Sequence, residues 1–324
     1  MKARRGKNVN PLLKFIFNSS HKEYGNKIMK ESASSPLDTF NQRSIGICFI
    51  LISAVAFGAM AIFANYAYSY GADPVTVLFL RFSIAGIIML MYHFVRKTKF
   101  PRGKLLLGCI LMGAIGYAGQ SFSYFTALLY ANSGTVAILL YLYPALVTVL
   151  SILFLKQKIS VTEIVALILA LTGTLCVIGL ELGGKPLGII LAVTAALFYS
   201  VYIISGSKIM SKTDVIDSST IIMMSAGLVY AVVILIKGAH FPSDLSGWGA
   251  IAGVVVVSTV IAIVTFFEGL KRIGPVHSSM LSTLEPVVTV VLAWVFFDEG
   301  LTPIKFLGGA LILMAGTLLA KKAA

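Results

Sequence analysis

Long apolar stretches alternate with short polar segments along most of this 324-residue chain. No charged residue occurs between Leu105 and Leu155, and the turn-forming segment Ala131-Asn132-Ser133-Gly134 divides this stretch into two. Each apolar stretch is close to the ~20 residues that a helix needs to cross the hydrocarbon core of a bilayer. The pattern predicts ten membrane-spanning helices, at 45–68, 74–95, 105–129, 134–154, 161–180, 186–207, 218–237, 246–270, 275–297 and 303–320.

The chain repeats itself at an offset of about 142 residues. Matching positions are Ala85-Gly86 with Ala226-Gly227 at an offset of 141, Pro144 with Pro286 and Leu150 with Leu292 at 142, and Gly173-Thr174-Leu175 with Gly316-Thr317-Leu318 at 143. We therefore divide the chain into a basic tail at 1–43 and two five-helix units at 44–182 and 183–322. An odd number of crossings makes the second unit enter the bilayer from the opposite side, so the units are inverted repeats, as in many transporters.

The composition supports this interpretation, because 58% of the residues are hydrophobic, 12% are charged and the mean hydropathy is +0.92. These values lie outside the usual range of soluble domains. A β-barrel is excluded because the sequence has no ten-residue segments of alternating polarity. The predicted fold is an all-α membrane protein with ten transmembrane helices arranged as two inverted five-helix repeats.

The net charge of +13 is distributed unevenly over the predicted helix ends. With the N-terminus inside, 22 of the 26 lysines and arginines fall on the inner side, against Lys185, Lys237 and Lys305 on the outer side. The positive-inside rule then predicts a multi-pass protein of the plasma (inner) membrane with both termini in the cytoplasm. Membrane lipids with anionic head groups explain the basic side, so nucleic acid is not an expected partner.

Residues 1–43 are polar and basic, and their apolar runs are too short for a secretory signal or a membrane span. The segment is either a cytoplasmic tail or, with a later start at Met29, partly untranslated. N-terminal sequencing of the expressed protein distinguishes the two.

Residues suited to cofactor or metal chemistry are sparse. Cys48, Cys109 and Cys176 occur singly in three apolar helices, without the spacing of a zinc or redox site, and are expected to be packing residues. The sequence has no glycine-rich phosphate loop, no paired His/Glu metal motif and no nucleophile elbow. We therefore predict no cofactor, no metal site and no enzymatic activity.

Glu285 is the acidic residue closest to the centre of a predicted helix. It lies about eleven residues from either helix end, which at 1.5 Å per residue places it ~15 Å deep, near the bilayer midplane. A bare carboxylate at this depth is costly, so we expect the group to face protein or water and to bind a proton or a substrate ammonium. The alternative is a neutral glutamic acid that forms hydrogen bonds where the helix bends.

Pro144 and Pro286 are equivalent positions of the repeat, and each removes a backbone donor in mid-helix. We expect both helices to be kinked there, and discontinuous helices in both halves mark substrate sites in transporters. Ser282 and Thr289 share a helix face with Glu285. Taken singly, such hydroxyls more often bond to their own helix.

Aromatic and amide side chains from several predicted helices are expected to complete the lining of the site. Such a surface suits small amphiphilic or aromatic solutes. For any single tyrosine, core packing or an interfacial position is an equally good explanation, so only the cluster supports a site. The candidate lining residues are Asn65, Tyr117, Gln120, Tyr124, Tyr143, Tyr199, Tyr202 and Ser282.

Arg81 lies seven residues from the outer start of its helix, ~10 Å below the surface. Its side chain can extend toward that surface or pair with an acidic group. We predict a structural or gating ion pair, with Glu285 as the candidate partner, in preference to direct contact with substrate. Nearer the inner side, Glu268 is followed by Lys271 and Arg272 at helical spacing, which favours a local ion pair.

The order of these residues resembles the EamA family of the drug/metabolite transporter superfamily over roughly 44–320. The matching segments are Arg81-Phe82 with Ala85, Tyr143-Pro144, Gly173, Leu284-Glu285-Pro286-Val287, Asp298-Glu299 and Gly316. The resemblance implies a transporter, often an exporter of amino acids or other small metabolites, with the substrate in a cavity between the two halves. The chain departs from the family at Gln157, where an acidic residue is expected before the fifth helix.

The sequence therefore predicts a secondary transporter that alternates access by rocking one half against the other, with Glu285 as the coupling or substrate-charge residue. Small organic metabolites are the predicted substrates, and amino acids are the leading class because one acid, one base and several aromatic rings match a zwitterion. A passive uniporter or channel for small amphiphilic solutes is the alternative, and in that case Glu285→Gln leaves any pH dependence unchanged. Substrate identity, direction, coupling stoichiometry and formation of a homodimer stay open.

Overall fold

A computed structural model of the chain describes residues 36–179, 183–298 and 300–321, with side chains described from residue 41 onward. The chain divides into two units, 1–43 and 44–324, and the contacts given below all lie within the second. Most of the predicted tail, including Met29, lies outside the described residues, as do Glu299 and the expected boundary at residue 182.

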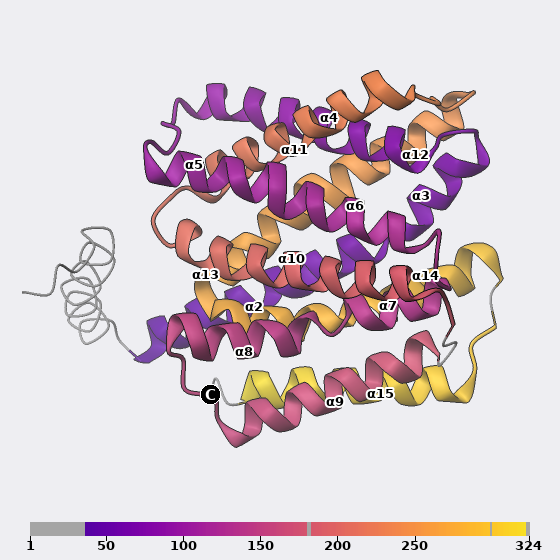
Figure 1. The fold of residues 1–324 in the computed structure, drawn as a ribbon. Helices are drawn as coiled ribbons and strands as arrows, with labels where there is room; N and C mark the ends of the chain where they lie inside the picture. The colour runs from indigo at the N-terminus through magenta and orange to yellow at the C-terminus, as the bar shows by residue number, and fades with distance from the viewer. Residues whose placement is uncertain (1–35, 180–182, 299, 322–324) are drawn as a thin grey trace, which may run out of the picture. The chain divides into compact units, whose positions relative to one another are not determined.

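Helices follow one another along the described part of the chain, where the only strand-like pairing is an isolated bridge between Ala131 and Gly184. The first helix begins at Pro36, well before the predicted start at 45. The elements are α2 (Pro36–Gly58), α3 (Met60–Ser69), α4 (Pro74–Arg96), α5 (Lys104–Leu111), the π-helix η1 (Met112–Tyr117), α6 (Ala118–Ala127), α7 (Ser133–Leu140), α8 (Tyr143–Leu155), α9 (Val161–Ile178), α10 (Pro186–Met210), α11 (Val215–Lys237), α12 (Leu245–Val255), the π-helix η2 (Val256–Ile261), α13 (Ala262–Leu281), the 3-10 helix η3 (Ser282–Leu284), α14 (Glu285–Phe297) and α15 (Pro303–Lys321) (Figure 1).

Nine helical stretches among the described residues are long and apolar enough to cross a membrane. The predicted class of all-α membrane protein is therefore confirmed. The longest stretch, Leu245–Phe297, has 53 residues and joins the predicted helices 246–270 and 275–297. Inside it the backbone leaves the helical conformation at Gly274, with φ 79° and ψ 171°, directly before Pro275. This positive φ favours glycine, and α13 consists of two helical segments that meet there.

Among the described residues, three membrane helices are interrupted by a turn or a 3-10 segment, in addition to the π-helical segments η1 and η2. α2 and α3 are separated at Ala59, α7 and α8 are separated after Leu140, and the helix that leads into α14 passes through η3. The last two breaks directly precede Tyr143-Pro144 and Glu285-Pro286, where proline lacks an N–H and its ring crowds the carbonyl four residues earlier. The two prolines thus account for breaks at equivalent distances along the chain.

Two pairs of helices make the most extensive contacts, α4 with α11 and α9 with α15, and Figure 1 shows each pair side by side. In the first pair, a Cβ atom on Gly86 would lie 3.2 Å from the backbone nitrogen of Met224. A Cβ atom on Gly227 would lie 3.1 Å from the backbone nitrogen of Ser83. Small residues at such crossings let helices approach closely, which is how helices associate in lipid.

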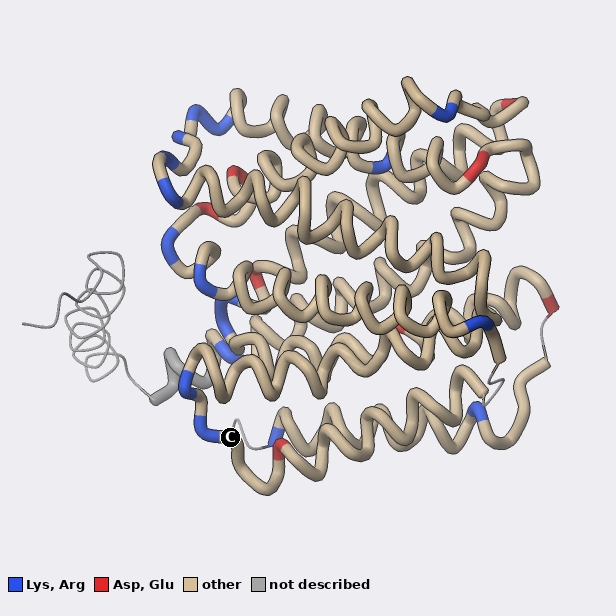
Figure 2. Tube along the Cα trace, in the orientation of Figure 1, with Lys and Arg blue, Asp and Glu red and all other residues tan. Residues whose placement is uncertain are grey.

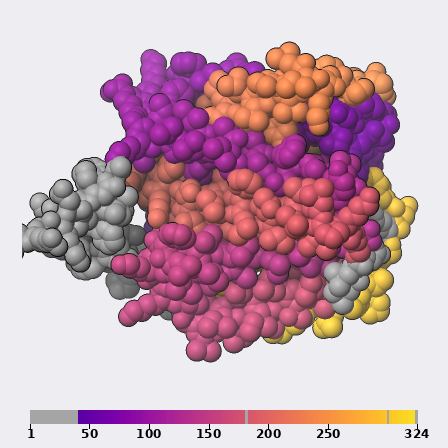
Figure 3. Space-filling view, viewed as in Figure 1, coloured from indigo at the N-terminus to yellow at the C-terminus, as the bar shows by residue number. Residues whose placement is uncertain are grey.

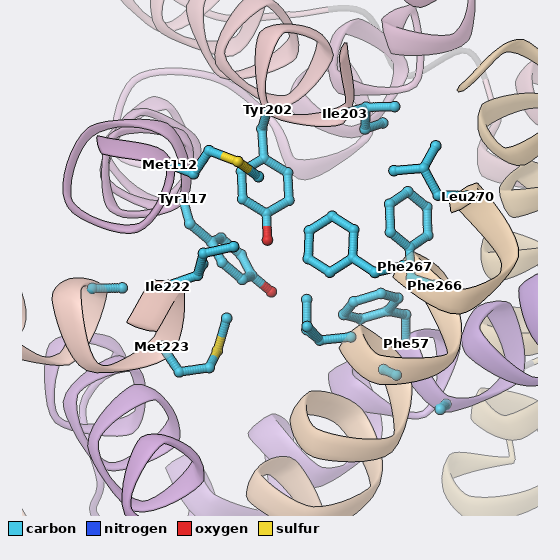
Figure 4. Close-up of a cluster of buried hydrophobic side chains, with 14 of the residues drawn as sticks. Phe57, Met112, Tyr117, Tyr202, Ile203, Ile222, Met223, Phe266, Phe267 and Leu270 are labelled. Carbon is cyan, nitrogen blue, oxygen red and sulfur yellow. The ribbon is translucent and has the colours of Figure 1, made fainter. Parts of the chain in front are cut away.

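The core of the unit formed by residues 44–324 is rich in aromatic side chains. α10 packs against α6 on one side and against α7 and α8 on the other, and Figure 3 shows its side chains as a band between them. Behind α10, buried side chains from η1, α2, α10 and α13 meet, and Figure 4 shows Tyr117, Phe57, Tyr202, Phe266 and Phe267 together.

The outward surface is apolar, and the charges lie mainly at the helix ends. Phe94 is 66% exposed and Leu235 is 85% exposed, as expected of side chains that contact lipid. Figure 2 shows most lysines and arginines of the described residues at the left-hand ends of the helices. The local ion pair of Glu268 with Arg272, predicted from their spacing, is confirmed.

A polar contact joins α4 to the start of α11. Arg96 donates from both terminal nitrogens to Asp214, at 3.1 and 3.2 Å. Burial raises the pKa of the Asp214 carboxyl, but hydrogen bonds from Arg96 and from backbone N–H groups more than offset burial, so the pKa lies below its usual value. The contact is therefore complete above the ordinary pKa of aspartate and is lost as the pH falls through the lower value of the folded state.

Gly113→Ala should destabilise the protein. A Cβ atom at Gly113, in η1, would lie 2.2 Å from the carbonyl oxygen of Ile222 in α11, and two backbones must separate to admit it. Overpacking of this kind costs about 1–3 kcal/mol. The melting temperature of the purified protein in detergent measures the effect.

Gly249→Ala is the matched control, because a Cβ atom at Gly249 meets nothing within 4 Å. Equal melting temperatures for the two variants would contradict the close contact between η1 and α11.

Candidate functional site

Glu285 lies at the point where three interruptions of the helices meet. It is the first residue of α14, directly after η3, and its side chain is only partly buried. The break between α2 and α3 packs against it, because a Cβ atom on Gly58 would lie 2.8 Å from the carbonyl oxygen of Glu285. One turn later, Thr289 donates to the carbonyl of Gly58 at 2.9 Å. Gly58 was not among the site residues predicted from the sequence.

Several tyrosine side chains lie near the Glu285 carboxyl. Tyr141, from the break between α7 and α8, lies beside it. Tyr141 and Tyr199 are partly accessible, like Glu285 itself, so polar groups of the site reach accessible space. The tyrosines within electrostatic range of the carboxyl are Tyr117, Tyr124, Tyr141, Tyr143 and Tyr199.

These rings form a continuous row between helices that are distant in the sequence. Each ring is within about 6 Å of the next, the range in which aromatic pairs attract one another beyond their burial. The centroid distances are 6.1 Å for Tyr141 and Tyr143, 4.7 Å for Tyr143 and Tyr199, 6.3 Å for Tyr199 and Tyr202, 5.3 Å for Tyr202 and Tyr117, and 4.8 Å for Tyr117 and Phe82.

Arg81 lies at the opposite end of this row from Tyr141. Its guanidinium carbon is 5.1 Å from the ring centroid of Phe82 and 5.3 Å from that of Tyr117. Nε donates to the hydroxyl of Thr259 at 2.8 Å, and Nη2 donates to the hydroxyl of Tyr117 at 2.5 Å. Thr259 lies in η2 and Tyr117 lies in η1, and π-helical turns occur frequently at functional sites.

The structure does not contain the direct ion pair predicted for Arg81. No carboxylate oxygen of the described residues lies within 4.0 Å of its guanidinium, and Thr259 and Tyr117 take that place. The charge of Arg81 still acts on Glu285, at longer range. The two residues belong to one electrostatic environment but do not touch.

The other predicted site residues lie around this row in different ways. Gln120 is partly buried and accepts a hydrogen bond from Ser121 at 3.3 Å. Ser282 is buried in η3, beside the hydroxyl of Tyr143. Asn65 is exposed on α3 and is not among the groups that act on Glu285.

Two cavities lie beside α3. Their volumes are about 270 and 160 Å³, and Phe63 and Tyr66 line both. Glu285 lines neither of them. One cavity lies between α3 and α12 and the other between α3 and α14, and none of the tyrosines in the row lines either of them.

A second polar cluster was not predicted from the sequence. Nδ1 of His93, in α4, lies 2.8 Å from a carboxylate oxygen of Asp217, in α11, and both side chains are buried. Thr98 donates to the same oxygen at 2.8 Å, and Phe100 stacks on the imidazole at 3.7 Å. Since 124 residues separate His93 from Asp217, only the packing of α4 on α11 brings them together.

Thr259→Val should destabilise the protein, because it removes the acceptor of Arg81 Nε with little change of shape. A hydrogen bond to a buried charged group contributes about 1.5–3 kcal/mol, and the melting temperature in detergent should fall accordingly.

The control is Thr265→Val, one to two turns further along. Its hydroxyl bonds only to carbonyls of its own helix, at Ile261 and Ala262. A Thr259→Val protein as stable as this control would mean that the guanidinium does not depend on Thr259.

Comparison with known proteins identifies the family of the chain. The sequence model of the EamA-like transporter family matches residues 44–179 and 186–320. An uncharacterized transporter of Archaeoglobus fulgidus is 27% identical over 275 residues, covering 85% of this chain and 96% of that protein. The uncharacterized transporter YcbK of Bacillus subtilis is 24% identical over 294 residues, covering 85% and 93%.

Two further similarities concern location and fold. The uncharacterized inner membrane transporter YedA of Escherichia coli K12 is 26% identical over 249 residues, covering 76% of this chain and 81% of that protein. A solved crystal structure matches with a TM-score of 0.75 at 20% identity, covering 86% of this chain and 99% of that chain, which shows the shared fold alone. The chain belongs to the EamA-like transporter family and is a multi-pass membrane transporter.

Proposed function

We propose that this protein is a secondary transporter of small organic metabolites, with amino acids as the leading substrate class, that works by alternating access and is coupled to protons through Glu285. The observation that carries the proposal is the position of Glu285. The carboxyl group of Glu285 is partly accessible at a helix break, and Tyr141 of the other half of the chain lies beside it. Ionisable residues at such depth generally belong to a substrate or proton pathway.

The proposal includes ten membrane crossings. A continuous helix of 53 residues, like the stretch Leu245–Phe297, would be about 80 Å long at 1.5 Å per residue, against a hydrocarbon core of about 30 Å. The break at Gly274 divides this stretch into two crossings. Eight further stretches then bring the total to ten.

Reciprocal contacts support two inverted repeats. Under the offset of 141, Ser83 corresponds to Met224 and Gly86 to Gly227. The contact of Gly86 with Met224 is matched by the contact of Gly227 with Ser83, as a two-fold relation between the halves requires. Tyr117 and Thr259, the two residues that bind Arg81, are 142 residues apart. Equivalent positions of the two halves thus hold one central guanidinium.

The distribution of charge supports an orientation with both termini in the cytoplasm. Lysines and arginines gather at one end of the described helices, and the positive-inside rule assigns that end to the cytoplasm. The name of the relative YedA, an inner membrane transporter, supports the same membrane for this chain. Anionic lipid head groups would meet the basic end.

The breaks provide hinges for alternating access. Transporters built from inverted repeats place their sites at discontinuous helices, and rocking of one half against the other exposes the site to each side in turn. The interruptions at Ala59, after Leu140 and at η3 lie around Glu285. An acid and a base at the two ends of a row of aromatic rings suit a small zwitterion with an apolar part.

A flux screen with the purified protein in liposomes tests the function. Amino acids, aromatic amines and sugars are offered with and without an inward or outward proton gradient. We expect at least one solute to move faster with the gradient, and Glu285→Gln to reduce this stimulation roughly tenfold, the loss of about 1.4 kcal/mol of coupling.

Glu268→Gln is the control, because the Glu268 carboxylate pairs locally with Arg272. If the rate of flux is the same with and without the proton gradient in both wild type and Glu285→Gln, the protein is better explained as a passive uniporter. No flux of any solute would contradict the proposed function.

Labelling of introduced cysteines tests the orientation. In a variant without Cys48, Cys109 and Cys176, a membrane-impermeant maleimide added to intact bacterial spheroplasts should label Lys237→Cys and not Lys99→Cys. Disrupted membranes should allow both reactions. The reverse pattern would mean that the basic end faces outward.

A further inference from the structure

Arg81 carries a buried positive charge, and no acidic group of the described residues is in direct contact with it. The residue is 4% exposed, and its two hydrogen bonds go to neutral hydroxyl groups. The third nitrogen, Nη1, has no hydrogen-bond partner among the residues that the structure describes. A charge in a low-dielectric interior is costly unless an opposite charge compensates it.

Tyr202 presents a second unused polar group at the same place. Its hydroxyl is buried and has no hydrogen-bond partner in the described part of the chain. Figure 4 shows this hydroxyl and that of Tyr117 pointing into the same space between η1, α10 and α13. The charge of Arg81 acts on the Tyr202 hydroxyl, and the rings of Tyr117 and Tyr202 are in contact at 5.3 Å.

Nη1 of Arg81 and the Tyr202 hydroxyl both need a hydrogen-bond acceptor. Nη1 of Arg81 can only donate a hydrogen bond, and the Tyr202 hydroxyl is a free donor as well. A carboxylate accepts both bonds at once and supplies the negative charge that the guanidinium lacks. The planar, permanently charged guanidinium is better suited to this geometry than an ammonium group.

We propose that Arg81, Tyr117 and Tyr202 form the binding site for the carboxylate of the transported solute. The assignment rests on the proposed transport function and makes it more specific. It gives Arg81 direct contact with substrate, in place of the ion pair with Glu285 predicted from the sequence. The carboxylate of the solute then lies at Arg81, and the apolar part of the solute lies along the row of tyrosines.

The orientation has a physical reason at each end. Thr259 and Tyr117 fix two nitrogens of Arg81, so the third points in a defined direction before the solute arrives. A preorganised donor of this kind loses little entropy on binding. Tyr143 and Tyr199, with ring centroids 4.7 Å apart, lie between the two ends and offer faces to the apolar part of the solute.

The test compares each acid that the liposome screen identifies with its primary amide, beginning with L-phenylalanine and L-phenylalaninamide. The amide has the same shape but no negative charge. We expect wild type to transport the acid at least ~10-fold faster than the amide, because a site built around a charged group leaves its donors unpaired with the analogue. Arg81→Gln should remove this preference.

Three further variants separate a binding role from a structural one. Arg81→Lys keeps the positive charge but lacks the planar guanidinium, so it should retain part of the preference for the acid over the amide. Tyr202→Phe should lower it about 3- to 10-fold, the effect of one hydrogen bond, without lowering the melting temperature. Tyr230→Phe is the control, because Tyr230 is equally buried and stacks on Phe82 but bonds to the carbonyl of Ala118. Its acid-to-amide ratio should equal that of wild type.

Several outcomes would overturn the assignment. If every transported solute lacks a carboxylate, or if Arg81→Gln keeps the preference for the acid, transport stands and the carboxylate site fails. A third outcome is an Arg81-dependent flux with equal rates for the acid and the amide. If replacing chloride by sulfate on both sides of the membrane abolishes that flux, the site holds an inorganic anion instead. If no solute moves at all, the proposed function itself fails.

Discussion

The hydrocarbon core of the bilayer cannot donate or accept hydrogen bonds, and the structure depends on this constraint. Every backbone group and every charge at membrane depth must find its partner inside the protein, so the described chain is helical almost throughout. The exceptions occur where a neighbour supplies the missing bond. At the break before Ala59, the carbonyl of Gly58 accepts from Thr289 of another helix. The irregular backbone at Gly58 thus lies next to Glu285, in the same region as the tyrosines of the site.

The same constraint explains how the helices associate. Lipid tails are as apolar as leucine side chains, so burial of apolar surface does not hold the helices together and close packing must do so. α4 and α11 accordingly meet at Gly86 and Gly227, and α9 and α15 meet where Gly173 and Gly308 each approach the carbonyl of the other. Two polar contacts then fix the register of α4 on α11. Arg96 forms an ion pair with Asp214, and His93 forms a hydrogen bond with Asp217. A sliding movement along this pair would break both polar contacts together, so α4 and α11 resist it.

The sequence predicts which segments are helical better than it predicts the neighbours of a residue. Apolar periodicity identified the helices and the all-α membrane class, and it placed Glu285 and Arg81 within long apolar helical stretches. Periodicity does not state which helix a side chain faces, and so the expected direct pair of Arg81 with Glu285 was wrong in this structure. The partner Thr259 is 178 residues away and looks like an ordinary threonine in an apolar helix. The π-helices η1 and η2 carry no local sequence signal either, because one extra residue per turn is stabilised by packing and not by propensity. Gly58, His93 and Asp217 were missed for the same reason.

Under the proposed mechanism, Arg81 is also where binding and movement meet. One of its hydrogen bonds goes to Tyr117 in the first half of the chain and the other to Thr259 in the second. A rocking movement that separates these two hydroxyls would lengthen at least one of the two bonds in the alternate state. An unpaired guanidinium nitrogen inside the membrane is unfavourable, and a solute carboxylate offers two additional acceptor oxygens. The solute would therefore stabilise the state with the stretched bond more than the resting state. Such a difference in affinity between two conformations is what a ligand needs in order to shift their populations.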